Sequence, residues 1–432
     1  MKRLYYLCLL TLTLLGFWAL GVRLLEGLKV TGLTSYFSWG AWVVLYIFFI
    51  GLSAGSFLLS TMIYVFNMHS LEKVGRIALL SALFALIGGL LFVFIDLGHP
   101  ERFWRSLVYW NTASVLVWEI RFYLLYILLV LAELWLVMRE DLGELAKHGT
   151  GWRRPLARVL SLGYRPAVTS EGRNRQQAAA ARWVKILGIL GVPMAVGVHG
   201  GTGSLFAVTI AKPFWNNSIV PVVFIVSALV SGAALVTFLY AFFAGEEEDK
   251  LGVLKSLAQL LILFIGIDLL LVAAEYLVGL YSGIPDDVEP MHQVIAGQYG
   301  LIFWLGQIGL AAVVPLLLCS LPRTRNSSRW LGLAGLSAII GIVAVRVNLI
   351  LPAYTVPQLS GLEKAYVDSR LTYNYLPSGN ELLTSIGLIA FLVLLFSLTW
   401  EALPLVKGNS MRQDNFEGRI QHEGSQSQLH QA

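Results

Sequence analysis

Two stretches of this sequence place ionisable side chains at the ends of long apolar segments. DLGHPERFW supplies Asp96, His99 and Arg102, and WEIRFY supplies Glu119 and Arg121. Ionisable groups at such depths usually face the interior of a helix bundle or a water-filled cavity. Carboxylate and imidazole groups exchange protons when burial or neighbouring charges shift their pKa. These residues therefore predict a polar pocket near one membrane face, although Asp96 as a plain cap of the following loop remains an alternative.

A third stretch, GVPMAVGVHGGTGSLF, contains His199 about fifteen residues into an apolar segment. At 1.5 Å per residue, this places the imidazole ~22 Å from the side where the segment begins. Histidine is suited to accepting and donating protons near neutral pH. We expect His199 to converge on the same pocket, with Gly200 and Gly201 leaving space around it. A histidine that only hydrogen-bonds a neighbouring helix is the alternative.

A second set of polar residues lies in later segments. Asp268 and Glu275 are seven residues apart and so share one helical face, while Arg346 and Asn348 occur at a similar depth. Arg346 is a candidate counter-ion for either acid, and Glu133 lies nearer the other membrane face. Glu133, Asp268, Glu275 and Arg346 are candidates for a proton relay. A buried acid–base pair that only holds helices together is equally compatible with the sequence.

Small residues cluster in the segment FIGLSAGSFLLS. They permit close helix–helix packing, which is the favoured interpretation, with room for a flat ligand as the alternative. The residues are Gly51, Ser53, Ala54, Gly55 and Ser56.

The elements that position these residues are membrane helices. Hydrophobic residues make up 57% of the chain, charged residues 13%, and the mean hydropathy is +0.71. A soluble domain carries about 25% charged residues, and a spanning helix needs roughly 20 apolar residues. The sequence therefore predicts an all-α integral membrane protein with about ten transmembrane helices. The apolar segments are 4–24, 40–66, 76–96, 116–138, 184–211, 218–243, 253–281, 296–321, 329–351 and 382–403.

The distribution of Lys and Arg predicts the orientation. Basic residues concentrate in alternate loops, above all in the loop 139–183, and such loops face the cytoplasm. Both termini are then cytoplasmic in an inner, cytoplasmic membrane, and DLGHPERFW faces outward. The net charge of +5 follows from this asymmetry and indicates no nucleic-acid partner. Cys8 and Cys319 lie in separate apolar segments and form no Cys-rich metal or iron–sulfur site.

The predicted organisation has five parts. The first apolar segment is interpreted as a retained helix and not as a cleaved signal, and the Gln- and Ser-rich tail is predicted to be disordered. The parts are an N-terminal helix and outer loop (1–35), a first four-helix bundle (36–211, including the loop 139–183), a second four-helix bundle (212–352), an outer loop and last helix (353–404), and the tail (405–432).

These motifs together resemble the NrfD / polysulfide reductase membrane-subunit family. DLGHPERFW resembles the family signature Asp-Leu-Gly-[Arg/His]-Pro-x-Arg, GLSAGSFLLS its small-residue helix, VHGGTGSLF its His-bearing helix, and AEYLVGLY its Glu-containing helix. The resemblance covers roughly residues 36–400. The count of ten apolar segments, together with WEIRFY at the start of the fourth, resembles the DsrP-like and HybB-like branch more closely. His99 stands where many relatives have Arg, which replaces a fixed cation by a titratable group.

The resemblance implies a quinone- or quinol-binding membrane anchor subunit of a multi-subunit respiratory oxidoreductase. It implies two four-helix bundles with flanking helices, a menaquinone or other quinone near the outer face, and no metal or haem bound by this chain. Electrons would pass between the quinone pool and a ferredoxin-like iron–sulfur subunit at the outer face, with further catalytic or cytochrome subunits beyond it, in sulfur-compound metabolism among other settings. The implied quinone-site residues are Asp96, His99, Arg102, Glu119, Arg121 and His199, with His199 and Asp96 nearest the chemistry.

Two other function classes remain open from the residues alone. A secondary transporter or ion-translocating protein would show inverted repeats and helices broken near the membrane midplane. Pro193 is one candidate break, but no matching break occurs in a second half of the chain. A structural anchor without redox chemistry is the third reading.

Overall fold

The computed structural model is built from helices throughout its described part. It describes residues 2–66, 68–109, 111–245, 249–357, 361, 368, 370–403 and 405, and no strand occurs among them. Apart from residue 405, the tail predicted to be disordered lies outside the described residues.

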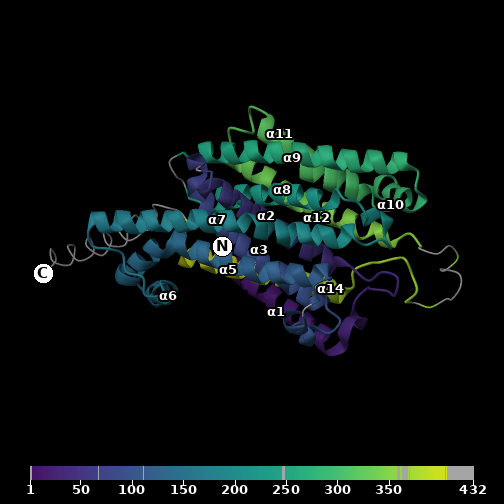
Figure 1. Ribbon diagram of the computed structural model, residues 1–432, viewed down its shortest axis with the longest axis horizontal. Coiled ribbons are helices and arrows are strands. Elements are labelled where there is room, and N and C mark those ends of the chain that lie inside the picture. The colour runs from purple at the N-terminus through teal and green to yellow at the C-terminus, as the bar shows by residue number, and fades with distance from the viewer. Residues whose placement is uncertain are drawn as a thin grey trace.

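Within the described part of the chain, ten helices are long and apolar enough to cross a membrane, which confirms the predicted all-α membrane fold. They run nearly parallel along the long axis of the molecule (Figure 1). The spans are built on α1 (Lys2–Glu26), α2 (Ala41–Tyr64), α3 (Gly75–Asp96), α5 (Val115–His148), α7 (Ser170–Ala207), α8 (Val220–Phe243), α9 (Lys250–Ser282), η5 (Ile302–Val313) continued by α11 (Val314–Ser320), α12 (Ser328–Ile350) and α14 (Gly379–Ala402).

Shorter elements connect the spans. They are η1 (Gly27–Val30), η2 (His69–Val74), η3 (Pro100–Arg102), α4 (Arg105–Val108), α6 (Arg153–Leu160), η4 (Pro213–Trp215), α10 (Pro285–Ile295) and η6 (Pro352–Tyr354). The segment predicted at 116–138 continues as helix to His148, and the one predicted at 184–211 begins at Ser170. Apolar composition marks only the part of a helix that lies in lipid, whereas helix-forming polar residues continue both helices into water.

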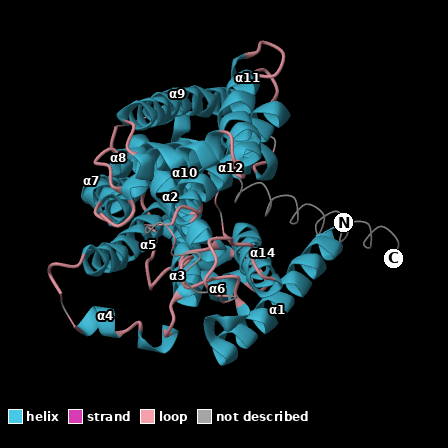
Figure 2. Ribbon diagram, turned by 90° about the vertical axis from the view of Figure 1, so that its right-hand side faces the viewer, coloured by secondary structure: helices cyan, strands magenta, loops and turns pink. Residues whose placement is uncertain are grey.

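The ten helices form two four-helix bundles and a flanking pair. In the first bundle, α2 packs on α3 and α7, and α5 packs on α3 and α7. The second bundle combines α8, α9, α12 and the η5–α11 helix. The flanking pair, α1 and α14, packs against itself and lies beside α3 (Figure 2).

The two bundles meet where α2 crosses α8 at very short range. A Cβ atom built on Gly55 would lie 1.7 Å from the carbonyl oxygen of Ala228, and one built on Gly232 would lie 2.0 Å from the carbonyl carbon of Gly55. Glycine is therefore required at both positions because the obstacle is backbone, which cannot rotate away. For Gly55, close packing is the reading that the structure supports.

Gly55→Ala is expected to lower the free energy of unfolding by about 1–3 kcal/mol, because the added methyl group forces α2 and α8 apart. The matched control is Gly266→Ala in α9, where an added Cβ meets nothing within 4 Å. Thermal unfolding of the two purified variants in the same detergent tests this. Equal melting temperatures would contradict the packing argument.

Candidate functional site

Glu119 is the centre of a buried hydrogen-bonded cluster inside the first bundle. Its side chain is 2% exposed, and its Oε1 accepts hydrogen bonds from the Tyr46 hydroxyl of α2 and the Thr202 hydroxyl of α7, both at 2.5 Å. Its Oε2 has no hydrogen-bond partner. We call Tyr46, Glu119 and Thr202 the Glu119 cluster; it ties three helices together and leaves one carboxyl oxygen available.

His199 lies in a second buried cluster, at the junction of the two bundles. The imidazole is 1% exposed, neither ring nitrogen has a hydrogen-bond partner, and its ring centroid lies 5.3 Å from that of Phe224 on α8. The guanidinium carbon of Arg346, on α12, lies 5.2 Å from the same Phe224 ring. Arg346 Nη2 donates to the Ser227 hydroxyl at 3.0 Å, while Arg346 Nε has no partner.

Gly51 of α2 completes this His199 cluster. A Cβ atom built there would lie 3.2 Å from Arg346 Nη2 and 3.5 Å from His199 Cε1. Gly51 therefore contacts both polar side chains, and a larger residue at this position would displace them. The small residues of α2 thus have different neighbours: Gly55 packs on the backbone of α8, and Gly51 packs on the side chains of His199 and Arg346.

The two clusters lie next to each other along α7. His199 and Thr202 are three residues apart, which places them on one helical face. Buried polar atoms without partners cost about 1–3 kcal/mol each, so such atoms in a native structure call for an explanation. Imidazole and guanidinium N–H groups donate to carbonyl oxygens, and a carboxyl group donates when protonated. The unpartnered atoms fit a ligand bearing carbonyl or hydroxyl oxygens.

Asp96 lies at the end of α3, beside an arginine that sequence reasoning missed. Arg23 of α1 is 1% exposed, and it donates from Nε to the Ile95 carbonyl at 3.0 Å and from Nη2 to the Leu97 carbonyl at 2.7 Å. Asp96 interacts electrostatically with Arg23. A cation at a helix C-terminus satisfies carbonyls that the helix itself leaves unpaired. Here the basic residue inside the sequence ALGVRLLEG was the available signal.

Glu381 was also missed, and it organises the same end of the molecule. It is 1% exposed and accepts hydrogen bonds from the Tyr375 hydroxyl at 2.7 Å, from Gly32 N at 2.7 Å and from Ser378 N at 2.8 Å. Ser378 and Glu381 form a capping box at the start of α14. The Ser-x-x-Glu spacing before an apolar run is the signal that predicts such a box.

The remaining residues of the predicted pocket lie outside both clusters. His99 and Arg102 have side chains that are 66% and 53% exposed, and both contact Glu101. A backbone hydrogen bond, together with these two neighbours, lowers the pKa of Glu101. Arg121 is half-buried and donates from Nη1 to the carbonyl of Val117 in its own helix at 2.9 Å. The structure thus brings Glu119 and His199 together and keeps His99 and Arg102 at the surface.

The residues of the second predicted set, in α9 and α12, also have different neighbours in the structure. Asp268 and Arg346 interact electrostatically, but no ion pair within 4.0 Å joins them among the described residues. Glu275 interacts electrostatically with Asp268. Asn348 donates to Gln307 Oε1 at 2.8 Å, and Gln307 belongs to the π-helical segment η5. Arg346 therefore lies between the acids of α9 and the His199 cluster, a position that helix depth alone did not reveal.

Comparisons with known proteins agree with this architecture. The family model described as "Polysulphide reductase, NrfD" matches residues 29–358. A selenate reductase subunit of Mesobacillus selenatarsenatis is 50% identical over 94% of this chain and 95% of its own length. The Hdr-like menaquinol oxidoreductase integral membrane subunit of Archaeoglobus fulgidus is 28% identical (90% and 89% covered). A polysulfide reductase polypeptide of Wolinella succinogenes is 26% identical (72% and 93% covered). With most of its length matched, this ten-helix membrane protein belongs to the NrfD polysulphide reductase family.

Proposed function

We propose that this chain is the quinone-reactive membrane anchor subunit of a multi-subunit respiratory oxidoreductase. It would exchange electrons between the menaquinone pool and a ferredoxin-like iron–sulfur subunit that contacts catalytic or cytochrome subunits. The observation that carries the proposal is the pair of adjoining clusters with unpartnered polar atoms on Glu119, His199 and Arg346. Support also comes from the relatives, one named a selenate reductase subunit and another a menaquinol oxidoreductase subunit.

The side chains of the proposed quinone site have different roles. Quinone supplies two-electron, two-proton redox chemistry. Arg346 Nε and the imidazole of His199 can hold the ligand oxygens as hydrogen-bond donors. Glu119 Oε2 can hold or release a proton, while Tyr46 and Thr202 fix the carboxyl group through Oε1. Asp268 and Glu275 lie behind Arg346 and remain proton-relay candidates.

The end of α3 is the face that we assign to the partner. The distribution of basic residues favours a cytoplasmic position for both termini and the loop 139–183, so η3 and α4 would face outward from the cytoplasmic membrane. His99 and Arg102 are exposed there, as are Phe103 and Trp104 at 52% and 45%. Figure 2 shows α4 projecting from the bundles at this end. A mixed aromatic and basic surface suits a contact with an acidic iron–sulfur protein.

Binding of a fluorescent quinol analogue to the purified subunit tests the proposal. Wild-type protein is expected to quench the fluorescence of the analogue in a saturable manner. His199→Ala is expected to weaken binding about tenfold, because the loss of one hydrogen bond of about 1.4 kcal/mol corresponds to a factor of ten in affinity. The matched control is His148→Ala, because His148 has a 76% exposed side chain at the far end of α5.

A second variant tests the position of His199 and Arg346 beside Gly51. Gly51→Leu places side-chain atoms between α2 and the pair His199–Arg346, and it is expected to abolish saturable binding. Wild-type protein that is folded but does not bind the analogue would contradict the proposed function. That result would favour a secondary transporter or a structural anchor. Binding unchanged in His199→Ala would limit His199 to a packing role.

A further inference from the structure

A cavity of about 340 Å³ opens at the end of the first bundle opposite Asp96. Residues from all four helices of that bundle and from η2 line it, so it lies between the ends of these helices. Its walls are polar near the loop 139–183 and become apolar or small toward the interior. The residues that matter below are Tyr64, Arg76, Val137, Glu140, Gln177 and Ala180.

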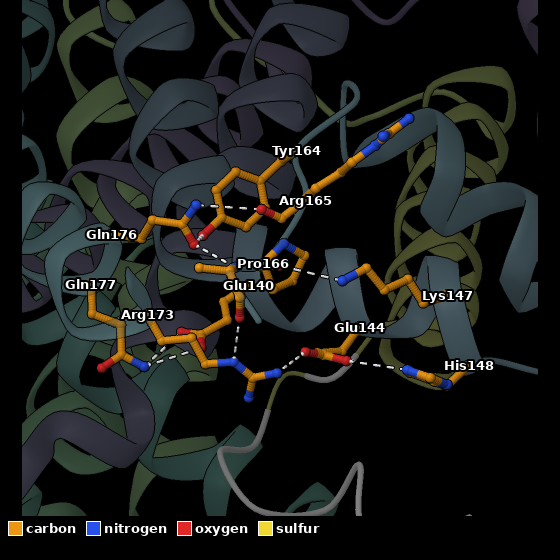
Figure 3. Close-up of polar contacts among 11 residues, drawn as sticks. Glu140, Glu144, Lys147, His148, Tyr164, Arg165, Pro166, Arg173, Gln176 and Gln177 are labelled. Carbon is orange, nitrogen blue, oxygen red and sulfur yellow. Dashed lines mark hydrogen bonds and ion pairs between the residues drawn. The ribbon is translucent and has the colours of Figure 1, made fainter. Parts of the chain in front are cut away.

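Polar contacts connect several residues that line this cavity, among them Glu140, Tyr164 and Gln177 (Figure 3). Gln177 Nε2 donates to Glu140 Oε2 at 2.8 Å, and the Tyr164 hydroxyl donates to Gln176 Oε1 at 2.8 Å. Arg139 Nη2 donates to the Gln176 carbonyl at 2.7 Å, and the guanidinium carbon of Arg139 lies 4.8 Å from the Tyr164 ring centroid. These contacts join α5 to the start of α7 and give water a hydrophilic entrance.

Glu133 precedes Val137 of the cavity wall by one turn of α5 and has no hydrogen-bond partner. It is 0% exposed, and both carboxyl oxygens are unpartnered. Glu133, Val137 and Glu140 follow the i, i+4, i+7 spacing and share one face of α5. One turn, or ~6 Å at 1.5 Å per residue, separates Glu133 from Val137 in the cavity wall. An isolated buried carboxylate is very costly, so this carboxyl group is either neutral or reached by water.

The described charged groups around Glu133 do not form an ion pair with it. Arg76 of α3 is engaged at the mouth by Asp141 and by the Val137 carbonyl. The Tyr64 hydroxyl of α2 interacts electrostatically with Glu133, Arg76 and Glu72 of η2. On the wall, α7 contributes only uncharged residues, among them Gln177 and Ala180. Glu133 is thus positioned to bind and release a proton without losing a fixed partner.

Hydroxyl groups continue from Glu133 toward the Glu119 cluster. Tyr126 shares the α5 face and interacts electrostatically with Glu133. Its hydroxyl donates to the Ser53 carbonyl at 3.3 Å and accepts from the Ser53 hydroxyl at 3.5 Å. Tyr123 interacts electrostatically with Tyr46 and Glu119. Fourteen residues of α5 separate Glu119 from Glu133, about 21 Å at 1.5 Å per residue. The first bundle therefore holds one acid near each end and tyrosine hydroxyls between them.

We propose that the cavity is the aqueous mouth of a proton path, and that Glu133 exchanges protons between that water and the Glu119 cluster. The inference rests on the proposed quinone site for its destination. Quinone reduction takes two electrons from the iron–sulfur partner and two protons through this path, and the protons end on the quinone oxygens. Oxidation of the quinol reverses every step. Because water enters from the loop 139–183 side, proton exchange at the quinone is coupled to the face opposite η3.

Hydrogen–deuterium exchange of protonated carboxyl groups, followed by infrared spectroscopy on the full chain in lipid, tests the path without any quinone. Glu133→Gln is expected to remove one exchangeable carboxyl band. Ala180→Phe fills the cavity and is expected to slow exchange of that band at least tenfold. The matched control is Ala179→Phe, because Ala179 is exposed, is next to Ala180 in the chain and does not line this cavity. In this variant the carboxyl band should exchange at the wild-type rate.

The proposal is overturned if Glu133→Gln removes no exchangeable band, or if Ala180→Phe exchanges as fast as Ala179→Phe. Should Ala180→Phe fail to fold, Gln177→Leu narrows the polar mouth and takes its place. In the assembled oxidoreductase, Glu133→Gln is expected to reduce proton uptake linked to quinone reduction about tenfold. Analogue binding by the subunit should remain unchanged. Loss of analogue binding in wild type would instead refute the quinone site and leave the exchange result standing.

Discussion

Glu119→Gln is expected to lower quinone-dependent turnover of the assembled oxidoreductase about 100-fold. General acid–base catalysis by one positioned group contributes roughly 10²–10⁴-fold, and Glu119 is the buried acid of the proposed site. The amide oxygen of glutamine can still accept from Tyr46 and Thr202, so the helices should remain joined. Steady-state turnover with a soluble quinol, beside analogue binding by the same preparation, measures the effect.

Two further variants distinguish a role of Glu119 in proton exchange from a role in helix packing. Thr202→Val removes one donor to Glu119 but leaves Tyr46 in place, so we expect a smaller loss of turnover than in Glu119→Gln. Glu289→Gln changes a glutamate on α10 that accepts a hydrogen bond from Gln293 in its own helix, and it should have no effect. Wild-type turnover in Glu119→Gln would refute its role in proton exchange. Loss of analogue binding in that variant would show that the carboxyl group positions the ligand.

Arg346→Gln is expected to weaken quinol-analogue binding about 100-fold. Hydrogen bonds to a charged group contribute about 1.5–3 kcal/mol, and each 1.4 kcal/mol corresponds to a factor of ten in affinity. Arg346 is 1% exposed, its Nε has no hydrogen-bond partner, and its Nη2 lies beside Gly51. The same substitution should also destabilise the fold, since Asp268 then lacks its electrostatic partner.

A double variant distinguishes these two consequences. Arg346→Gln combined with Asp268→Asn removes both charges and is expected to recover thermal stability without recovering affinity. Recovery of both would mean that Arg346 serves the fold and does not touch the ligand. Affinity unchanged in the single variant would contradict the placement of the quinone at the His199 cluster.

Helix depth in the membrane was predictable because it follows from counting residues along an apolar segment. The ten spans and the depth of the ionisable groups were predicted in this way, whereas the family was predicted from the resemblance of its motifs. Glu119 and His199, predicted as partners on depth alone, lie in adjoining clusters because Thr202 links α5 to α7. His99 and Arg102 were predicted at the same depth, but the turn after Asp96 directs both to the surface.

Rotation about each helix axis and the choice of neighbouring helices were decided by tertiary packing. Helices such as α2 and α8 are apolar on every side, so their sequences do not mark which face turns inward. Backbone contact between Gly55 and Gly232 sets the α2–α8 crossing, and that crossing brings Gly51 to Arg346. Sequence alone therefore determined a ten-helix membrane protein of this family and the depth of its ionisable groups. Only the tertiary structure decided which of them meet, because close packing of small residues fixes the relative rotation of the helices.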